Sequence, residues 1–264
     1  HNTIIGNYIG LAQNGTTRRA NGSDGIDLGD GANNNFIGGL KAGERNVISG
    51  NGNDGVELFH SFKTSPAKTT LNEVVGNFIG VSADGNPALD VRNNWNGIVL
   101  EDNADGNIFH RNIIAGNGAN GISLITVSHQ TITENIIGVV PKNLAANGYL
   151  VPDPVTISVD NLTSKPNGLR GVREEGRNGI YLVGGSQYNL MQKNLIAFNP
   201  HKGILLSADR GFEYITNRSC ETWFNTISEN RIFNNGEEGI FFVENLCSTT
   251  NTTVYPNQGI QPPV

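Results

Sequence analysis

A short repeat that begins with glycine limits what this chain can fold into more than any other feature of its sequence. The repeat is Gly-apolar-x-apolar, in which the two apolar positions are Ile, Val, Leu or Phe. Its copies occupy residues 25–28, 55–58, 97–100, 121–124, 179–182, 203–206 and 239–242. Alternating apolar positions over so few residues are typical of a short β-strand with one buried face. We therefore expect a chain built from many short, similar strands.

A second motif lies between these copies and supplies two further strands. In Asn72-Glu-Val-Val-Gly-Asn77-Phe-Ile, an Asn comes before each short apolar run, and similar segments recur along the chain. Asn suits a bend because it tolerates the left-handed backbone conformation and bonds its own backbone. Each unit then holds three strands, and one of the tightest units, from Gly97 to Gly121, is 24 residues long.

Three short strands per unit, returning to the same register, predict an all-β fold, a right-handed parallel β-helix. We expect about eight coils, stacked about 4.8 Å apart, with Asn side chains hydrogen-bonded along the stack. The repeat predicts two columns of inward-pointing side chains. The first column is Ile26, Val56, Ile98, Ile122, Ile180, Ile204 and Ile240, and the second is Leu28, Leu58, Leu100, Leu124, Leu182, Leu206 and Phe242.

Composition supports this fold and excludes several others. Of the 264 residues, 34 are Gly and 38 are Asn, and both disfavour helix interiors. Hydrophobic residues make up 37% of the chain, which is enough for a core and argues against disorder. No apolar run approaches the roughly 20 residues that span a bilayer, so we expect no membrane span. The formal net charge of −6 argues against nucleic acid as a partner.

Excess length enters the coils at regular places. Loops 11–24, 81–96 and 139–178 should leave the same corner of alternate coils, and insertions on one face often mark the working face of a solenoid. A second insertion is expected at 209–224 and an extended C-terminal segment at 245–264. We assign residues 1–264 to a single domain and expect it to be part of a longer protein.

Two phrases of the sequence are familiar from a known family. The segments Asn77-Phe-Ile-Gly-Val-Ser-Ala-Asp-Gly-Asn-Pro-Ala-Leu89 and Arg45-Asn-Val-Ile-Ser-Gly-Asn-Gly52 resemble bacterial secreted and surface proteins that carry parallel β-helix repeats. The resemblance covers nearly the whole chain. It implies the fold of the pectate-lyase-like proteins and an extracellular or cell-surface location, but the repeat itself carries no catalytic residues to transfer.

Polar residues at the repeat suggest a catalytic site on the first coils. The predicted register stacks Asp27 over Glu57 and aligns Asp30, His60 and Asp102 in a second column. Stacked carboxylates raise one another's pKa and can share Ca²⁺, and a His between two Asp can act as a general base. The alternative is that the second column consists of solvated turn residues at strand ends. No cofactor is required, and Ca²⁺ held by Asp27 and Glu57 is the one ion considered.

The same outward column becomes apolar further along the chain. Tyr181, Leu205 and Phe241 follow one another in it, with Val243 beside them, and we consider this stripe a candidate binding surface. An exposed stripe of this size exceeds what soluble monomers usually tolerate. Either loop 139–178 folds over it or a partner does.

The two cysteines, Cys220 and Cys247, lie about one coil apart. A disulfide between them would stabilise this end of the chain by about 3 kcal/mol in the chain-entropy model. The alternative is that both are buried free thiols.

Two functions remain open. The first is an extracellular structural or adhesive rod, part of a surface protein or a filament subunit, that associates with itself or with a neighbouring domain at an open N-terminal coil. The second is a polysaccharide-active enzyme, a lyase or glycoside hydrolase, that uses the first coils beside loop 81–96. The signature motifs of polygalacturonases and alginate epimerases do not occur in the sequence.

Overall fold

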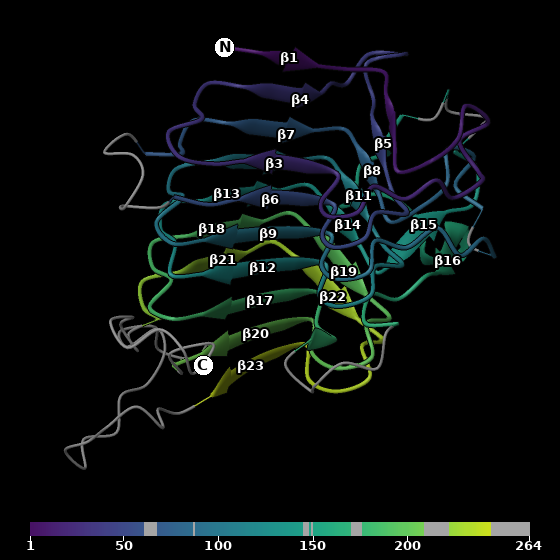
Figure 1. Ribbon diagram of the computed structural model, residues 1–264. Coiled ribbons are helices and arrows are strands. Elements are labelled where there is room, and N and C mark those ends of the chain that lie inside the picture. The colour runs from purple at the N-terminus through teal and green to yellow at the C-terminus, as the bar shows by residue number, and fades with distance from the viewer. Residues whose placement is uncertain are drawn as a thin grey trace.

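The structure, a computed structural model, describes residues 1–60, 68–86, 88–144, 148, 150–169, 176–208 and 222–243. In this part of the chain, three parallel sheets of seven strands each surround a common core (Figure 1). The chain visits the three sheets in turn, and each circuit adds one strand to every sheet. The predicted parallel β-helix is confirmed, with seven coils described rather than about eight.

The strands are two to four residues long. The first sheet contains β1 (Thr3–Ile4), β4 (Phe36–Gly38), β7 (Glu73–Val75), β10 (Ile108–His110), β13 (Thr131–Thr133), β18 (Leu190–Gln192) and β21 (Thr226–Ser228). The second contains β2 (Tyr8–Ile9), β5 (Val47–Ile48), β8 (Phe78–Ile79), β11 (Ile113–Ile114), β14 (Ile136–Ile137), β19 (Leu195–Ala197) and β22 (Arg231–Phe233). The third contains β3 (Ile26–Leu28), β6 (Val56–Leu58), β9 (Ile98–Glu101), β12 (Ile122–Ile125), β17 (Ile180–Val183), β20 (Ile204–Ser207) and β23 (Ile240–Val243).

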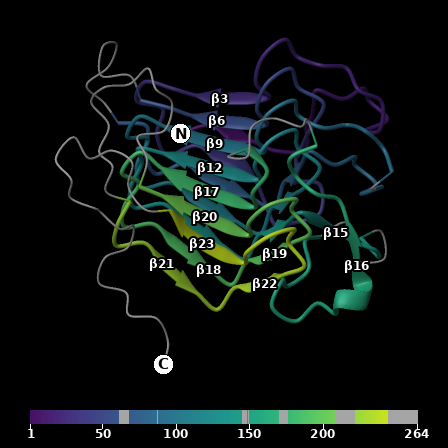
Figure 2. The same ribbon diagram turned by 90° about the horizontal axis from the view of Figure 1, so that it is seen from below.

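Strand pairing in the third sheet follows the register that the glycine repeat predicts, and Figure 2 shows its strands in one row. Ile26 pairs with Val56, Val56 with Ile98, and Ile98 with Ile122. A slip of one residue would turn every apolar position to the outside, so burial of one face fixes this register. The inward side chains of all three sheets form one hydrophobic core along the helix.

Glycine begins each copy of the repeat because the neighbouring coil comes too close for a side chain. A Cβ atom on Gly97 would lie 2.5 Å from Cγ2 of Ile114 and 2.7 Å from the backbone oxygen of Gly121. Gly55 has the same surroundings one coil earlier. The glycine of the repeat therefore marks where the chain passes close to the next coil as it enters the third sheet.

Buried Asn side chains join successive coils, as predicted. The backbone N–H and the Nδ2 group of Asn46 both donate to Oδ1 of Asn77, at 3.1 and 3.0 Å. Asn77 repeats this pair of bonds to Asn112 and also donates from Nδ2 to the backbone oxygen of Ile37 at 2.9 Å. Each carboxamide therefore satisfies buried backbone groups at a bend, where no strand partner is available.

Three such ladders run along the helix. The ladder before the first sheet is Asn2, Asn35, Asn72, Asn107, Gln130, Asn189 and Asn225. The ladder before the second sheet is Asn7, Asn46, Asn77, Asn112, Asn135, Asn194 and Asn230. The ladder after the second sheet is Asn21, Asn51, Asn93, Asn117, Asn167, Asn199 and Asn235.

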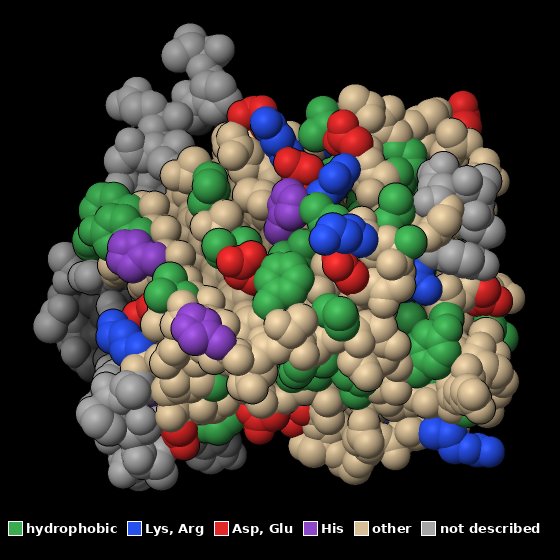
Figure 3. Space-filling view, turned by 90° about the horizontal axis from the view of Figure 1, so that it is seen from above, with side chains coloured by type: hydrophobic (Ala, Val, Ile, Leu, Met, Phe, Trp, Pro, Cys, Tyr) green, Lys and Arg blue, Asp and Glu red, His purple; other side chains and the backbone are tan. Residues whose placement is uncertain are grey.

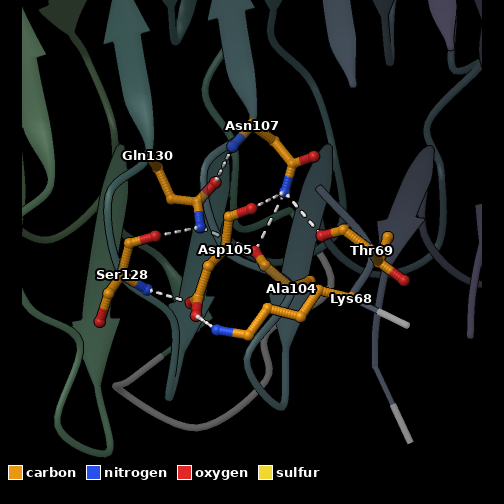
Figure 4. Close-up of polar contacts among 7 residues, drawn as sticks. All are labelled: Lys68, Thr69, Ala104, Asp105, Asn107, Ser128 and Gln130. Atoms are coloured by element: carbon orange, nitrogen blue, oxygen red, sulfur yellow. Dashed lines mark hydrogen bonds and ion pairs between the residues drawn. The ribbon is translucent and has the colours of Figure 1, made fainter. Parts of the chain in front are cut away.

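Gln130 takes the place of Asn in one rung, as Figure 4 shows. Its Oε1 accepts the backbone N–H of Asn107 at 2.9 Å. Its Nε2 donates to the backbone oxygens of Ala104 and Ser128, at 2.7 and 2.9 Å. The side chain of Asp105 braces the same bend by accepting the backbone N–H of Ser128 at 2.7 Å. The ladder therefore depends on the amide group rather than on Asn itself.

The residue before a ladder Asn often adopts the left-handed conformation, which non-glycine residues rarely do. His129 and Tyr188 have φ of 61° and 55°, and Arg111 and Glu134 have φ of 52° and 55°. The bend turns these side chains outward, where they meet their counterparts from the next coil. The rings of His129, Tyr188 and Phe224 stack at 5.2 and 5.0 Å, and Arg111 pairs with Glu134 at 3.4 Å. Figure 3 shows a histidine against hydrophobic side chains at the left edge of the face.

The three long loops leave the corner between the second and third sheets on the first, third and fifth coils, as predicted (Figure 2). Within loop 139–178, β15 (Val139–Pro141) pairs antiparallel with β16 (Leu162–Ser164), and a 3₁₀ turn, η2 (Val159–Asn161), precedes β16. The sequence did not reveal this hairpin.

The described part of loop 139–178 covers the second sheet. Val140, Leu144 and Leu162 belong to a hydrophobic cluster that includes Val47 and Phe78 on the outer side of that sheet. The expectation that this loop folds over the apolar stripe of the third sheet stays a prediction, because part of the loop lies outside the described residues.

Several expectations fall on other parts of the chain. Most of the second insertion, 209–224, and the whole C-terminal segment, 245–264, lie outside the described residues, as do Cys220 and Cys247. The proposed disulfide therefore stays a prediction. Within the described ranges, no helix has the length and apolar character needed to cross a membrane.

We predict that Asn77→Ala lowers the free energy of unfolding by about 2–4 kcal/mol. The substitution removes the acceptor of two bonds and leaves the donors of Asn46 buried without a partner. Urea unfolding measures this loss. Asn53→Ala is the control because Asn53 lies outside the three ladders, and we expect a change within about 0.5 kcal/mol there. An equal loss of unfolding free energy in both variants would show that the ladder contributes little to stability.

Candidate functional site

Carboxyl groups gather on the outer face of the third sheet at its first coils. We call this surface the carboxylate face, and it comprises Asp24, Asp27, Asp54, Glu57 and Glu101. Strand pairing places Asp27 of β3 beside Glu57 of β6, so the structure brings together the two carboxylates that the repeat was expected to stack. Because adjacent strands lie about 4.8 Å apart, the two side chains leave the sheet as close neighbours.

Glu57 is the most strongly perturbed group of this face. Burial raises the pKa of Glu57 to about 8, and repulsion from Asp24, Glu101, Asp27 and Asp54 adds to the effect. Glu57 therefore holds its proton at neutral pH. The pKa of Asp27 is also raised, first by burial and then by Asp24 and Asp30.

Asp54 belongs to the same face, and sequence reasoning missed it. Its side chain is 6% exposed, and Oδ1 accepts the backbone N–H of Asn96 at 2.5 Å. Burial raises the pKa of Asp54 to about 7, although the bonds from Asn96 act in the opposite direction. The sequence did contain a signal that sets Asp54 apart. The residue before the repeat glycine is Asp24 or Asp54 in the first two coils and Asn in the next three.

The second predicted column has a different character. Asp102 follows β9 directly and Asp30 lies two residues after β3, and they have φ of 52° and 49°, as turn residues do. His60, which occupies the equivalent position in the repeat copy between them, is only 1% exposed. A substrate on the outer face has no direct access to a side chain buried to this degree, so we leave His60 out of the proposed mechanism.

Loop 81–96 forms one border of the carboxylate face. The backbone N–H of Trp95 donates to the oxygen of Asn53 at 3.1 Å, and the oxygen of Trp95 accepts the N–H of Ala119 at 2.8 Å. These bonds fix Trp95 at the corner that leads into the third sheet. Trp95 is 39% exposed. An exposed indole at the edge of a polar face is typical of surfaces that bind ligands with mixed polarity.

A cavity of about 420 Å³ lies where the three long loops meet, and Arg18, Arg92, Asn94 and Leu169 line it. Arg18 is held in place because Nε donates to the backbone oxygen of Gly50 at 2.7 Å and Nη2 donates to Oδ1 of Asn94 at 3.0 Å. The cavity therefore places Arg18 and Arg92 beside loop 81–96, which borders the carboxylate face. Neither arginine was singled out from the sequence, because only the folded loops bring them together.

The apolar stripe is mostly covered. Tyr181 and Leu205 are only 9% and 7% exposed, and they form a cluster with their neighbours against which Val243 packs. Phe241 is 37% exposed, and Nζ of Lys202 lies 5.1 Å from the centre of its ring. A binding role for Tyr181, Leu205, Phe241 and Val243 stays a prediction, and only the end of the stripe is open in the described structure.

The described residues contain no group of three or more His, Cys, Asp or Glu side chains placed to hold a metal ion. Asp27 and Glu57 by themselves offer only two carboxyl groups, whereas Ca²⁺ takes six to eight oxygen ligands. Glu57 would also have to lose its proton first. A Ca²⁺ ion between them stays a prediction.

The paired carboxyls have the properties of an acid–base pair. A protonated Glu57 can donate a proton at neutral pH, and the neighbouring Asp27 can act as nucleophile or base. Retaining glycosidases place two carboxyls about 5–5.5 Å apart, whereas inverting enzymes need about 6.5–9.5 Å. Side chains on adjacent strands of one sheet match the shorter separation better.

Solved structures with a similar fold include two alginate epimerases and a tailspike. The A-module of mannuronan C-5 epimerase AlgE4 from Azotobacter vinelandii is 13% identical, with a TM-score of 0.51 over 83% of this chain and 52% of that one. The periplasmic alginate epimerase AlgG is 14% identical, with a TM-score of 0.47 over 83% and 41%. The Dettilon tailspike protein gp208 is 12% identical, with a TM-score of 0.38 over 86% and 39%.

This chain spans about half or less of each of these structures. At such low identity, the likeness concerns the fold alone. No curated protein sequence matches the chain significantly. A family model described as "Right handed beta helix region" matches residues 88–261, which is more than half of the chain. The chain therefore belongs to the family of proteins with a right-handed β-helix region.

Proposed function

We propose that this protein cleaves a polysaccharide on the carboxylate face, with Glu57 as general acid and Asp27 as its carboxylate partner. The observation that carries the proposal is the stacking of these two side chains on adjacent strands, with Glu57 holding its proton at neutral pH. Asp27 is exposed on this face, and Trp95 borders it with an indole against which a sugar ring can pack. The similar fold of the mannuronan C-5 epimerase module, with a TM-score of 0.51, supports a polysaccharide ligand.

The charge of the carboxylate face narrows the range of polysaccharides that could be its substrate. Ionised carboxylates on this face would repel a densely charged polyanion, and they would do so more strongly as Asp54 and Glu57 lose their protons with rising pH. A neutral polysaccharide avoids this repulsion. Hydrolysis with retention agrees with the close spacing of the two carboxyls, whereas a lyase would need a uronate substrate.

We predict that Glu57→Gln and Asp27→Asn each lower the rate of hydrolysis at least about 100-fold. Release of reducing ends from neutral glucans, mannans, xylans and galactans measures the rate, with polyuronates as the charged comparison. Glu73→Gln is the control, because Glu73 lies on the first sheet, between Phe36 and Ile108 in register. Activity should fall as pH rises through about 8, where Glu57 loses its proton. Unchanged rates in both variants, or no cleavage of any polysaccharide, would exclude this function.

We predict that Asp54→Asn stabilises the protein above neutral pH. The pKa of Asp54 is raised from 3.8 to about 7 on folding, so the unfolded chain ionises first. Stability contributed by this group is therefore full below pH 4 and decreases as pH rises to about 7. The variant should gain about 2–4 kcal/mol at pH 8 and little at pH 4. Urea unfolding at both pH values checks this, with the exposed Asp160→Asn as control; parallel pH profiles for wild type and Asp54→Asn would contradict it.

The structural or adhesive rod is the second candidate, and the direction of the Asn ladders favours it. In all three ladders, each Asn donates to the Asn of the following coil and accepts from the preceding one. A second copy or a neighbouring domain stacked on the first coil could therefore donate to its carboxamide oxygens and continue the ladders. Light scattering and electron microscopy at micromolar concentration test this version. Filaments or ordered oligomers are expected, and a monomer at all concentrations would exclude self-association.

Both candidates assume a location outside the cell or at its surface. The proposed location rests on the resemblance to secreted and surface proteins and on the acidic composition of the chain. Polysaccharide is the partner common to both versions, as substrate for the first and as attachment surface for the second.

A further inference from the structure

Asn-Gly pairs recur at the bends of this protein, and such pairs are chemically labile. The backbone nitrogen that follows an Asn can attack the side-chain carboxamide, and Gly permits this attack because it has no Cβ atom in the way. The sequence has ten such pairs, and both residues are described in nine of them. The nine pairs are residues 14–15, 21–22, 51–52, 96–97, 117–118, 120–121, 167–168, 178–179 and 235–236.

Eight of the nine pairs have the attacking nitrogen held in a hydrogen bond. The N–H of Gly52 donates to the backbone oxygen of Asn21 at 2.9 Å, and the N–H of Gly118 donates to that of Asn93 at 2.9 Å. The other six glycines donate to backbone oxygens at 2.8–3.1 Å, and they are Gly15, Gly97, Gly121, Gly168, Gly179 and Gly236. A bonded nitrogen reacts only after the structure around it opens, so the coil protects these pairs.

The pair Asn21-Gly22 is the exception. Among the described residues, no group accepts a hydrogen bond from the N–H of Gly22. Both residues of the pair are exposed, and a Cβ on Gly22 would meet no atom within 4 Å. Water and hydroxide therefore reach this peptide nitrogen without any opening of the fold.

The carboxamide of Asn21 is also held less firmly than that of its neighbour in the ladder. Oδ1 of Asn51 accepts Nδ2 of Asn21 at 2.9 Å, and Nδ2 of Asn51 donates to Oδ1 of Asn93 at 2.8 Å. The carboxamide of Asn51 is thus bound at both ends. Within the described ranges, the carboxamide of Asn21 is bound only through Nδ2. One hydrogen bond costs less to break than two, so this group turns more easily toward the nitrogen of Gly22.

Exposure alone does not single out Asn21, because Asn14 is exposed as well. The nitrogen of Gly15 is bonded, since its N–H donates to the oxygen of Ala12 at 2.8 Å. Oδ1 of Asn14 accepts the N–H groups of Thr16 and Thr17, at 3.1 and 3.0 Å. The pair 14–15 is therefore an exposed comparison in which both reacting groups are held.

We propose that Asn21 is a site of spontaneous modification that converts to aspartate and isoaspartate in water. The nitrogen of Gly22 gives its proton to hydroxide and bonds to Cγ of Asn21, and the carboxamide nitrogen takes a proton from water and leaves as ammonia. Water then opens the five-membered imide at either carbonyl, which leaves a carboxylate. The product no longer donates to Oδ1 of Asn51, so the first rung of this ladder loses its bond. The modification does not depend on either candidate function.

The test is incubation of the intact protein at pH 8.5 in water labelled with ¹⁸O, followed by digestion and mass spectrometry of the peptides. Incorporation of ¹⁸O at Asn21 is expected to be at least about tenfold faster than at Asn14, Asn51 or Asn117. In the urea-unfolded protein, the four positions should react within about threefold of one another, because the protecting bonds are gone. Equal rates at Asn21 and Asn14 in the folded protein, or the same preference for Asn21 after unfolding, would overturn the proposal.

Gly22→Ala and Ala20→Gly form a matched pair of variants on the two sides of Asn21. The φ of Gly22 lies outside the left-handed region and the space around it is open, so Ala fits there without strain. Its Cβ hinders the attacking nitrogen, and Gly22→Ala should slow the conversion at least about tenfold. Ala20→Gly leaves that nitrogen unchanged and should alter the rate less than about threefold. Urea unfolding of both variants verifies that the fold is intact, and an unchanged rate in Gly22→Ala would contradict the proposed chemistry.

Discussion

The carboxamide–backbone hydrogen bond at each bend is the interaction on which the whole helix depends. A coil of three short strands has three bends, and at each one the chain turns inward with N–H and C=O groups that no strand partner can reach. An Asn at this point accepts from the backbone and side chain of one coil and donates to the next. Because the bonds run from coil to coil, each bend is stable only when its neighbours stack upon it. The core and the ladders therefore form together.

The same logic explains why Asp54 is important for the chemistry of the third sheet. It occupies a column in which Asn96 and Asn120 accept backbone N–H groups from the following coil, and it accepts one itself. A carboxyl in the place of an amide is buried, so its pKa is raised and it adds to the repulsion felt by Glu57. The acid–base character of the carboxylate face thus results in part from a structural position in the coil.

The sequence predicted the architecture well because the constraints that produce it are local and periodic. Gly97 and Asn77 have to be glycine and asparagine for reasons that recur in every coil, so the register, the inward columns and the loop corner could be read from spacing alone. Loop 139–178 has no such period, and its packing against the second sheet depends on which apolar surface its hairpin meets. The hairpin of β15 and β16 could not be predicted from spacing for that reason.

The candidate site was predictable only in part. The stacking of Asp27 and Glu57 follows from the repeat, because both occupy its outward position. Burial of His60 and of Asp54 could not be derived, since burial depends on how neighbouring turns fill the space around a residue. The meeting of Arg18 with Arg92 at one cavity required the loops of two coils to be placed in three dimensions.

The left-handed corners have one further consequence. At these positions the backbone conformation is set by the bend, while the side chain points outward and meets its counterparts one coil above or below. Arg111 and Glu134 make a charge ladder at one corner, and His129, Tyr188 and Phe224 make a ring stack at another, on the same backbone geometry. Each corner is thus a row of surface positions spaced by the distance between successive coils. Substitutions along one row would change the surface of the protein one coil at a time and leave the backbone conformation of each coil unchanged.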